Sequence, residues 1–256
     1  MFDMINVLLK PLENIVRELG RISMMLTESI YLAFMPPFKL SYIFKQMEFI
    51  GVRSVFVIIL TGAFTGMVLA LQSYYGFKKF GSEGLVGATV ALSMTRELGP
   101  VLTSLMVSGR AGSAMAAELG TMRVTEQIDA LTAMALNPIK YLVTPRIIAA
   151  FLVLPVLTVI SDFIGIIGGY LVGVKLLGIN EGAYIDKMIK FVELNDIYNG
   201  LVKSAVFGVI LSIVSCYKGF YAKGGAEGVG RATTEAVVAS SVTILVTDYI
   251  LTSFMF

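Results

Sequence analysis

The 256-residue chain is 56% hydrophobic and only 15% charged, and its mean hydropathy of +0.82 favours one membrane unit over soluble domains. Its 20 basic and 18 acidic residues leave a net charge of +2, so nothing indicates a nucleic-acid partner. With no histidine and a single cysteine, Cys216, the sequence excludes histidine-based catalysis, an intrachain disulfide and a Cys/His metal site, and we expect no cofactor.

Residues 1–35 have the pattern of an amphipathic helix. Apolar side chains recur every three or four positions from Met1 to Leu26, and charged side chains fall on the other side. This pattern predicts a helix that lies in the membrane interface. The alternative is a helix packed on a soluble domain, but the rest of the chain offers no such domain.

Five apolar segments follow, and each is long enough to cross ~30 Å of hydrocarbon as a helix. The expected spans are residues 54–77, 84–117, 147–174, 197–217 and 236–256. The predicted fold is therefore an all-α membrane protein with one domain over residues 1–256 and a transmembrane region over 54–256. Small residues repeat at four-residue steps, as at Gly62 and Gly66, and we expect them to allow close packing of helices within the chain.

Basic residues in the short loops predict the orientation of these spans. The segment between spans two and three contains Arg123, Lys140 and Arg146, and further basic residues precede span one and follow span four. The loop between spans three and four carries more acidic than basic residues. By the positive-inside rule, the N-terminus and the segment between spans two and three are cytoplasmic. The glycine-rich residues 223–231 match no nucleotide-binding pattern and are expected to form a flexible cytoplasmic turn.

Five charged residues lie inside the apolar segments, where each costs roughly 2.5–3.5 kcal/mol on insertion scales. They are Arg96, Glu97, Asp162, Lys203 and Asp248. Their signs allow ion pairs, for example Arg96 or Lys203 with Glu97 or Asp248. Two interpretations remain open: a buried network that only fixes helix register, or the polar lining of a cavity for a charged or zwitterionic group. Asp162 could instead face water near a kink at Pro155.

The segment between spans two and three predicts a short amphipathic helix over about residues 121–136. Thr125 can cap it, and the acidic first turn contains Glu126, Gln127 and Asp129. Ile128, Leu131 and Ala135 then share one face. Such a helix can dock into a groove of a partner protein or lie flat on lipid, and its acidic first turn favours the partner.

An ordered series of motifs resembles the MlaE/YrbE family, the permease subunits of ABC transporters that work with MCE-domain proteins. The motifs are Gly66-Met-Val-Leu-Ala-Leu-Gln72, Thr95-Arg-Glu-Leu-Gly-Pro100, Gly109-Arg-Ala-Gly-Ser113, the block from Ala117 to Leu131, Asn137-Pro138, Pro145-Arg146 and Arg231-Ala-Thr-Thr234. The resemblance covers nearly the whole chain.

The resemblance implies a permease in the bacterial inner membrane that has no ATPase site of its own. Two copies would sit on two cytoplasmic ABC ATPases beneath a ring of MCE proteins, with a small cytoplasmic STAS-domain subunit as a further partner. The complex would move lipids, typically phospholipids, between the inner membrane and the MCE partner and so maintain outer-membrane lipid asymmetry.

The resemblance also assigns roles to residues. Arg96, Glu97, Lys203 and Asp248 would line the lipid cavity, and Leu69, Phe77 and Phe80 would contact acyl chains. The helix that carries Glu126, Gln127, Ile128, Asp129 and Leu131 would be the coupling helix in the ATPase groove. Lys45 and Arg231 would serve assembly on the cytoplasmic side.

Two other classes of protein are weighed against the permease. An ion-coupled secondary transporter would use Glu97 or Asp248 as a proton carrier and would need no ATPase. A membrane-embedded enzyme would need a nucleophile and a base, and the sequence lacks the usual pairs.

Overall fold

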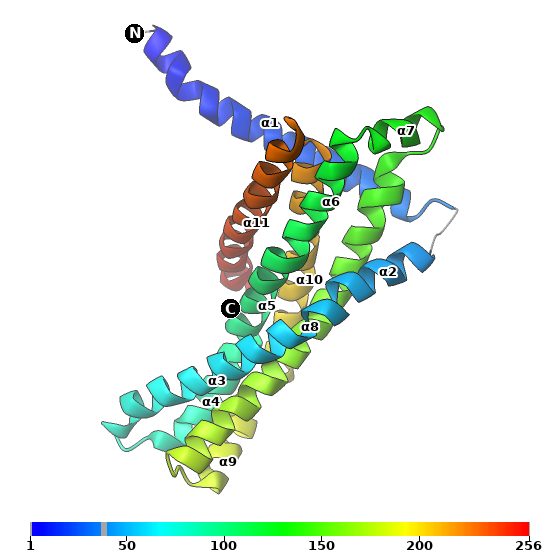
Figure 1. Cartoon of the computed structure of the whole chain (residues 1–256). Helices are drawn as coiled ribbons and strands as arrows, with labels where there is room; N and C mark the ends of the chain where they lie inside the picture. The colour runs from blue at the N-terminus through cyan, green and yellow to red at the C-terminus, as the bar shows by residue number, and fades with distance from the viewer. Residues whose placement is uncertain (1, 37–39, 256) are drawn as a thin grey trace.

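The computed structural model describes residues 2–36 and 40–255, with backbone only for residues 2–12, 14 and 15. Every regular element in these ranges is helical, which confirms the predicted all-α class (Figure 1). The first elements are α1 (Phe2–Ala33), α2 (Leu40–Ile50), the 3-10 turn η1 (Val52–Ser54) and α3 (Val55–Lys78). The others are η2 (Glu83–Leu85), α4 (Val86–Ser93), η3 (Met94–Leu98), α5 (Gly99–Val107), η4 (Ser108–Gly112), α6 (Ser113–Val124), α7 (Gln127–Ala133), η5 (Ile139–Val143), α8 (Thr144–Tyr170), η6 (Leu171–Leu176), α9 (Glu181–Phe191), α10 (Leu194–Phe220) and α11 (Gly225–Met255).

In the described part of the chain, four helices are long and apolar enough to cross a membrane. They cover Leu40–Lys78, Ile139–Leu176, Leu194–Phe220 and Gly225–Met255, and they coincide with four of the five expected spans. The remaining expected span, residues 84–117, lies in a continuous helical rod that runs from α4 to α6. The charges of Arg96, Glu97 and Arg110 lower the hydropathy of this rod, which explains why it is not among the four.

The rod is interrupted by two π-helical segments, η3 and η4. Each π segment widens the helix locally, a feature that is rare and often found at functional sites. The two segments contain Arg96, Glu97 and Arg110, which are the charged residues in the apolar part of the rod. The helical geometry of the rod therefore changes from α to π at its charged residues.

Close packing of α3 against α8 depends on glycine. A Cβ atom added at Gly66 would collide with the carbonyl oxygen of Gly165, and one added at Gly62 would lie 2.8 Å from the carbonyl oxygen of Ser161. The four-residue steps of small residues therefore let the two backbones touch, as expected.

Serine and glycine bring the rod against α10 and α11. The hydroxyl oxygens of Ser108 in η4 and Ser240 in α11 lie 2.5 Å apart. A Cβ atom at Gly219 in α10 would lie 2.5 Å from the carbonyl oxygen of Ala116 in α6. The small residues of the rod thus pack inside the chain as well.

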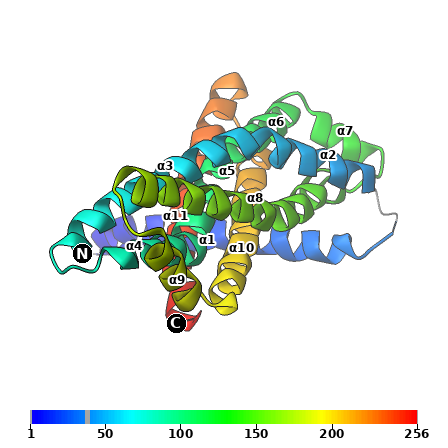
Figure 2. The same ribbon diagram turned by 90° about the horizontal axis from the view of Figure 1, so that it is seen from below.

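The bundle has two distinct ends, which we call the α7 end and the α9 end after the short helix at each. At the α7 end, α1 crosses the ends of α6, α10 and α11, and its N-terminal part extends beyond the bundle (Figure 1). The second half of α1 is anchored there, since Met25 and Ser29 are buried and Ser29 Oγ lies 2.9 Å from Thr144 Oγ1 of α8. α9 and the loop after α3 form the other end (Figures 1 and 2).

Two segments differ from the sequence-based expectations. The helix expected over residues 121–136 is shorter, because α6 continues to Val124 and α7 covers only Gln127–Ala133. The expected flexible turn over residues 223–231 is wrong: Gly224 and Gly225 have left-handed φ angles of 96° and 66° that make a tight turn, and α11 begins at once.

Candidate functional site

Lys203 is the centre of a cluster of charges inside the bundle. Its side chain is fully buried in α10, and its ammonium Nζ lies 2.7 Å from Glu97 Oε2 of η3 and 3.3 Å from Asp248 Oδ1 of α11. The same ammonium donates to Thr252 Oγ1 at 2.7 Å and to the carbonyl oxygen of Arg96 at 3.1 Å. Three predicted residues from three separate segments are therefore brought together, and Thr252 joins them.

Arg96 points away from this cluster and pairs with a residue that the sequence analysis placed in a loop. Its guanidinium lies 2.7 Å from Oδ1 of Asp196, whose side chain is only 4% exposed. The other carboxylate oxygen, Oδ2, accepts a hydrogen bond from the backbone N–H of Glu193 at 3.0 Å and completes a capping box at the start of α10. The expected pairing of Arg96 with Glu97 or Asp248 is thus replaced by Asp196.

The π segment η3 holds Arg96 and Glu97 between two neighbouring helices. On one side, a Cβ atom at Gly200 of α10 would collide with the carbonyl oxygen of Thr95. On the other side, a Cβ atom at Gly99 would collide with Oδ1 of Asp162 of α8. The backbone of Gly200 on one side and the side chain of Asp162 on the other thus pack closely against η3 and its end, and this packing fixes the position of the segment.

Asp162 does not face water, contrary to one expectation. It is 9% exposed, and among the described residues its Oδ1 atom has no hydrogen-bond partner. It fills the space that Gly99 leaves beside η3, so its place is inside the packing of α8 against the rod.

The Lys203 cluster is open on one side. The side chain of Glu97 is 35% exposed and that of Asp248 is 20% exposed, although the Lys203 side chain between them is fully buried. Large apolar side chains of α11 are exposed beside Asp248, including Leu245, Tyr249 and Ile250. The cluster has two carboxylates for one ammonium, and it meets an apolar surface. Such a site can receive a polar group that carries apolar chains.

The three residues expected to contact acyl chains lie in and after α3. Leu69 and Phe77 pack against a buried apolar cluster that contains Ala70 and Val90, and Phe80, just beyond α3, is 81% exposed. Phe80 follows the end of α3 at Lys78 and so lies in the loop at the α9 end.

The expected coupling residues lie on and just before α7. Glu126 precedes the helix in a left-handed conformation with a φ angle of 59°, and Thr125, the expected cap, donates instead to the carbonyl oxygen of Thr121 at 2.8 Å. Ile128 is buried, whereas Gln127 and Asp129 are exposed and Leu131 is half-buried. Asp129 also binds Arg123 NH1 at 2.6 Å. The turn is therefore anchored by Ile128 and presents its polar side outward.

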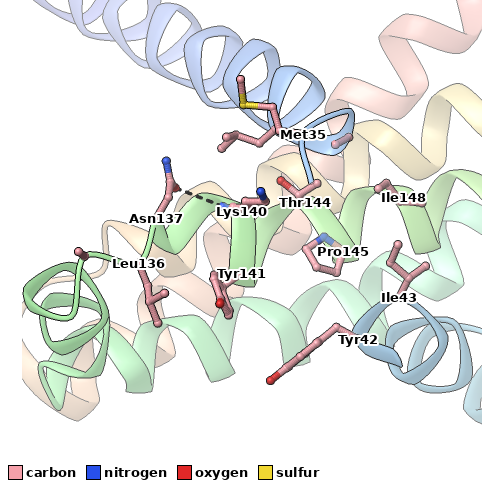
Figure 3. Close-up of a pocket in the computed structure, with 13 residues that line it drawn as sticks. Met35, Tyr42, Ile43, Leu136, Asn137, Lys140, Tyr141, Thr144, Pro145 and Ile148 are labelled. Carbon is pink, nitrogen blue, oxygen red and sulfur yellow. Dashed lines mark hydrogen bonds between the residues drawn. The ribbon is translucent and has the colours of Figure 1, made fainter. Parts of the chain in front are cut away.

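A cavity of about 360 Å³ opens near α7, between the end of α1, the start of α2 and η5 (Figure 3). Its walls are mainly apolar and include Ile43, Pro145 and Ile148. Lys140 lies at its edge and donates through Nζ to the carbonyl oxygen of Pro36 at 2.9 Å, while its backbone N–H donates to Asn137 Oδ1 at 3.2 Å. This cavity lies at the α7 end and is separate from the Lys203 cluster.

Lys45 and Arg231, expected to serve assembly, are both exposed but come from different helices. α2, which carries Lys45, and the start of α11, which carries Arg231, lie apart in both views (Figures 1 and 2). The structure does not bring these two residues together.

Sequence reasoning missed Asp196 and Thr252, although a signal for each was present. Asp196 stands seven positions before Lys203, so both lie on one face of a helix, and Thr252 stands four positions after Asp248. Periodicity counted from the known charges would have found both. The buried Arg146 of α8 also forms an ion pair at 2.7 Å with Glu118 of α6, whose side chain is half-exposed, and this contact ties α8 to α6.

Long apolar helices around a buried charge cluster define a multi-pass membrane protein of the permease type. Comparison with known proteins makes the assignment specific: residues 43–254 match the family described as Permease MlaE. The chain belongs to this family.

Several relatives are similar over most of their length. A probable ABC transporter permease protein of Rickettsia conorii is 48% identical over 256 residues, all of this chain and 99% of the relative. The intermembrane phospholipid transport system permease protein MlaE of Haemophilus influenzae is 43% identical over 83% of this chain and 82% of its own. The chloroplastic protein TRIGALACTOSYLDIACYLGLYCEROL 1 of Arabidopsis thaliana is 43% identical over 83% of this chain and 61% of its own.

Proposed function

We propose that the chain is the membrane subunit of an ABC transporter that moves lipids, with phospholipids as the main substrate. The observation that carries the proposal is the Lys203 cluster, which is buried at its centre and open at Glu97 and Asp248 beside an apolar surface. A phospholipid has the matching chemistry, a charged head group joined to apolar chains. The name of the Haemophilus influenzae relative, a phospholipid transport permease, supports the same substrate class.

The charges suit a zwitterionic head group in particular. Glu97 and Asp248 share one ammonium, so the cluster has spare negative charge for an amine, while the half-exposed Arg96 can turn towards a phosphate. A second copy of the chain would close the open side and complete a lipid cavity, in which Leu69, Phe77 and Phe80 contact acyl chains. A ring of MCE-domain proteins would receive or deliver the lipid outside the membrane, in the service of outer-membrane lipid asymmetry.

A cytoplasmic ABC ATPase is proposed to bind at α7 and the preceding Glu126. The anchored turn with exposed Gln127 and Asp129 and a half-buried Leu131 is small enough to enter a groove of a partner. Beside it lies a shallow cavity that Ile128 and Phe220 help to line. Lys45 and Arg231 are proposed to assist assembly on this side, where a small STAS-domain subunit would also bind.

The orientation follows from charge. The α7 end carries Arg123, Lys140 and Lys223, whereas the α9 end combines Lys187 and Lys190 with several carboxylates. The positive-inside rule then puts the α7 end and the N-terminus in the cytoplasm, with the protein in the bacterial inner membrane.

Replacement of Arg96 by alanine tests the lipid site. We expect the purified complex to retain less phospholipid, measured by mass spectrometry, while Arg53→Ala at the junction of α2 and α3 has no such effect. Unchanged bound lipid in a stable Arg96→Ala complex would reduce Arg96 to a structural ion pair.

An ion-coupled secondary transporter is the second candidate function, because two carboxylates share one ammonium in the bundle. It predicts transport by the chain alone, driven by a proton gradient. Reconstituted vesicles that contain the chain without an ATPase separate the two: transport there would favour the ion-coupled function, and its absence until an ATPase and ATP are added would favour the ABC function.

A further inference from the structure

A second cavity, of about 400 Å³, is lined by charged residues of α1, α10 and α11. Figure 1 shows that α1 crosses the end of α10 and the start of α11 in this region. Its lining contains five basic side chains and two carboxylates, supplied by all three helices and the turn before α11. They are Arg17, Glu18, Arg21, Lys218, Lys223, Arg231 and Glu235. We call this the basic cavity, since positive charge is in clear excess.

The two carboxylates of the basic cavity are already used. Lys218, whose side chain is 16% exposed, binds Glu18 of α1 and lies 3.2 Å from Glu235 of α11. Glu235 also lies 3.7 Å from Arg231 Nε. Lys218 thus links the three helices, and both carboxylates of the basic cavity are paired with basic groups of the chain.

Two basic groups of the cavity are left without a carboxylate. Arg17 pairs with Glu13 along α1 at 2.8 Å, but neither Arg21 nor Lys223 forms a salt bridge with any side chain that the structure describes. Arg21 comes from α1 and Lys223 from the turn before α11, so the positive charge faces the cavity from two directions. The excess of charge fits an anion that bridges them.

If α1 lies in the membrane interface, as its sequence predicts, the cavity lies at the depth of lipid head groups. Beside it, α1 exposes Val16, Leu19 and Met24, each more than half exposed, as expected for a helix in the membrane interface. Tyr221, which also lines the cavity, is half-exposed at the end of α10, and tyrosine is enriched at this depth.

We propose that the basic cavity binds the phosphate of an anionic phospholipid from the leaflet at the α7 end. A guanidinium can hold two phosphate oxygens at once, and basic clusters beside a membrane attract anionic lipids. The site is distinct from the Lys203 cluster, since Lys203 and Lys218 are separated by about 22 Å along α10. A phosphate held by Arg21 and Lys223 would fasten α1 to the turn between α10 and α11. Only the assignment of this leaflet to the cytoplasmic side rests on the orientation proposed above.

The test compares two double variants of the full chain, purified in uncharged detergent with its co-purifying subunits. Arg21→Gln with Lys223→Gln removes the unpaired charges, and Lys79→Gln with Lys190→Gln removes two charges elsewhere. Cys216 is the only cysteine of this chain and is buried, so a thiol-reactive dye labels this chain when it unfolds, and the label is counted on this chain after its band is separated from the other subunits. Phosphatidylglycerol, phosphatidylethanolamine and glycerol 1-phosphate are the added probes.

We expect phosphatidylglycerol to raise the unfolding temperature of the natural chain and of the control variant by several degrees, and phosphatidylethanolamine to raise it far less. The Arg21/Lys223 glutamine variant should lose most of the shift. Arg21→Lys with Lys223→Arg keeps both charges and should retain the shift, and this variant provides the test if the glutamine variant fails to fold.

Three results would overturn the proposal. One is an equal phosphatidylglycerol shift in the Arg21/Lys223 glutamine variant, which would place the lipid elsewhere. Another is an equal shift with glycerol 1-phosphate, which would assign the cavity to a soluble phosphate. The last is loss of a partner subunit from the glutamine variant while its lipid shift remains, which would make the cavity a protein-docking site.

Discussion

Lys203 Nζ lies 2.7 Å from Glu97 Oε2, although 106 residues separate them along the chain. This contact joins α10 to a π segment of the rod, and Asp248 of α11 joins from a third direction. Removing the ammonium would leave two carboxylates near each other in the bundle, where unpaired charge is costly.

We therefore expect Lys203→Met to destabilise the chain by about 3–5 kcal/mol. Adding Glu97→Gln and Asp248→Asn to the same chain should restore much of this loss, because the charges that need the ammonium are then gone. The unfolding temperature in detergent measures both. Equal stability of the single variant and the natural chain would show that the cluster is more hydrated than its burial indicates.

Gly66 offers a test of the contact between α3 and α8. Gly66→Val should cost about 1–3 kcal/mol, because its side chain must displace the backbone of Gly165. Gly76→Val in the same helix is the matched control, since an added Cβ atom there meets nothing within 4 Å. Thermal unfolding should separate the two variants, and a similar stability for both would mean that the helices can move apart freely.

The proposed contact between α7 and the ATPase can be tested by substitution. Leu131→Glu places a charge on the half-buried face and should reduce ATPase co-purification and ATP-driven lipid transport by at least about tenfold, roughly 1.4 kcal/mol of binding. Ile189→Glu on α9, at the opposite end, controls for a new charge at an exposed apolar site. Normal co-purification and transport in the Leu131→Glu complex would show that α7 does not form the contact with the ATPase.

Asp196 serves both Arg96 and the start of α10, and two substitutions separate these roles. Asp196→Asn keeps an oxygen that can accept from the N–H of Glu193 but removes the charge that Arg96 binds. Asp196→Ala removes both and should cost about 0.5–1.5 kcal/mol more, because the hydrogen bond from the N–H of Glu193 is lost as well. Circular dichroism melts would reveal the difference, and identical melting of the two variants would show that the cap contributes nothing.

Much of this architecture could be predicted from the residues, because hydropathy and helix length depend on local composition. The all-helical fold and the positions of α3, α8 and α10 follow from apolar runs. The cluster of Lys203, Glu97 and Asp248 was predictable only as one of several pairings, since charge signs do not tell which helices touch.

The remaining features depend on tertiary contacts. Asp196 was assigned to a loop because the apolar run begins only after it, and its seven-residue spacing from Lys203 does not tell that α10 begins at Leu194 or which residue its carboxylate meets. A position near water was an open alternative for Asp162, because the sequence does not reveal that Gly99 leaves room for its carboxyl group. The early start of α11 was missed because its many glycines are poor helix formers that packing nevertheless accommodates.

Because Asp196 binds two partners with its two oxygens, a ligand that binds Arg96 also affects the start of α10. One oxygen holds the guanidinium and the other holds the first turn of α10, so a phosphate that draws Arg96 away leaves a negative carboxylate beside the positive end of that helix. The freed carboxylate can then bind the helix end more tightly, and the arrival of a head group would be felt as stiffening at the junction of α9 and α10. Lipid binding at Arg96 and the stability of the start of α10 would thus be coupled through the carboxylate of Asp196.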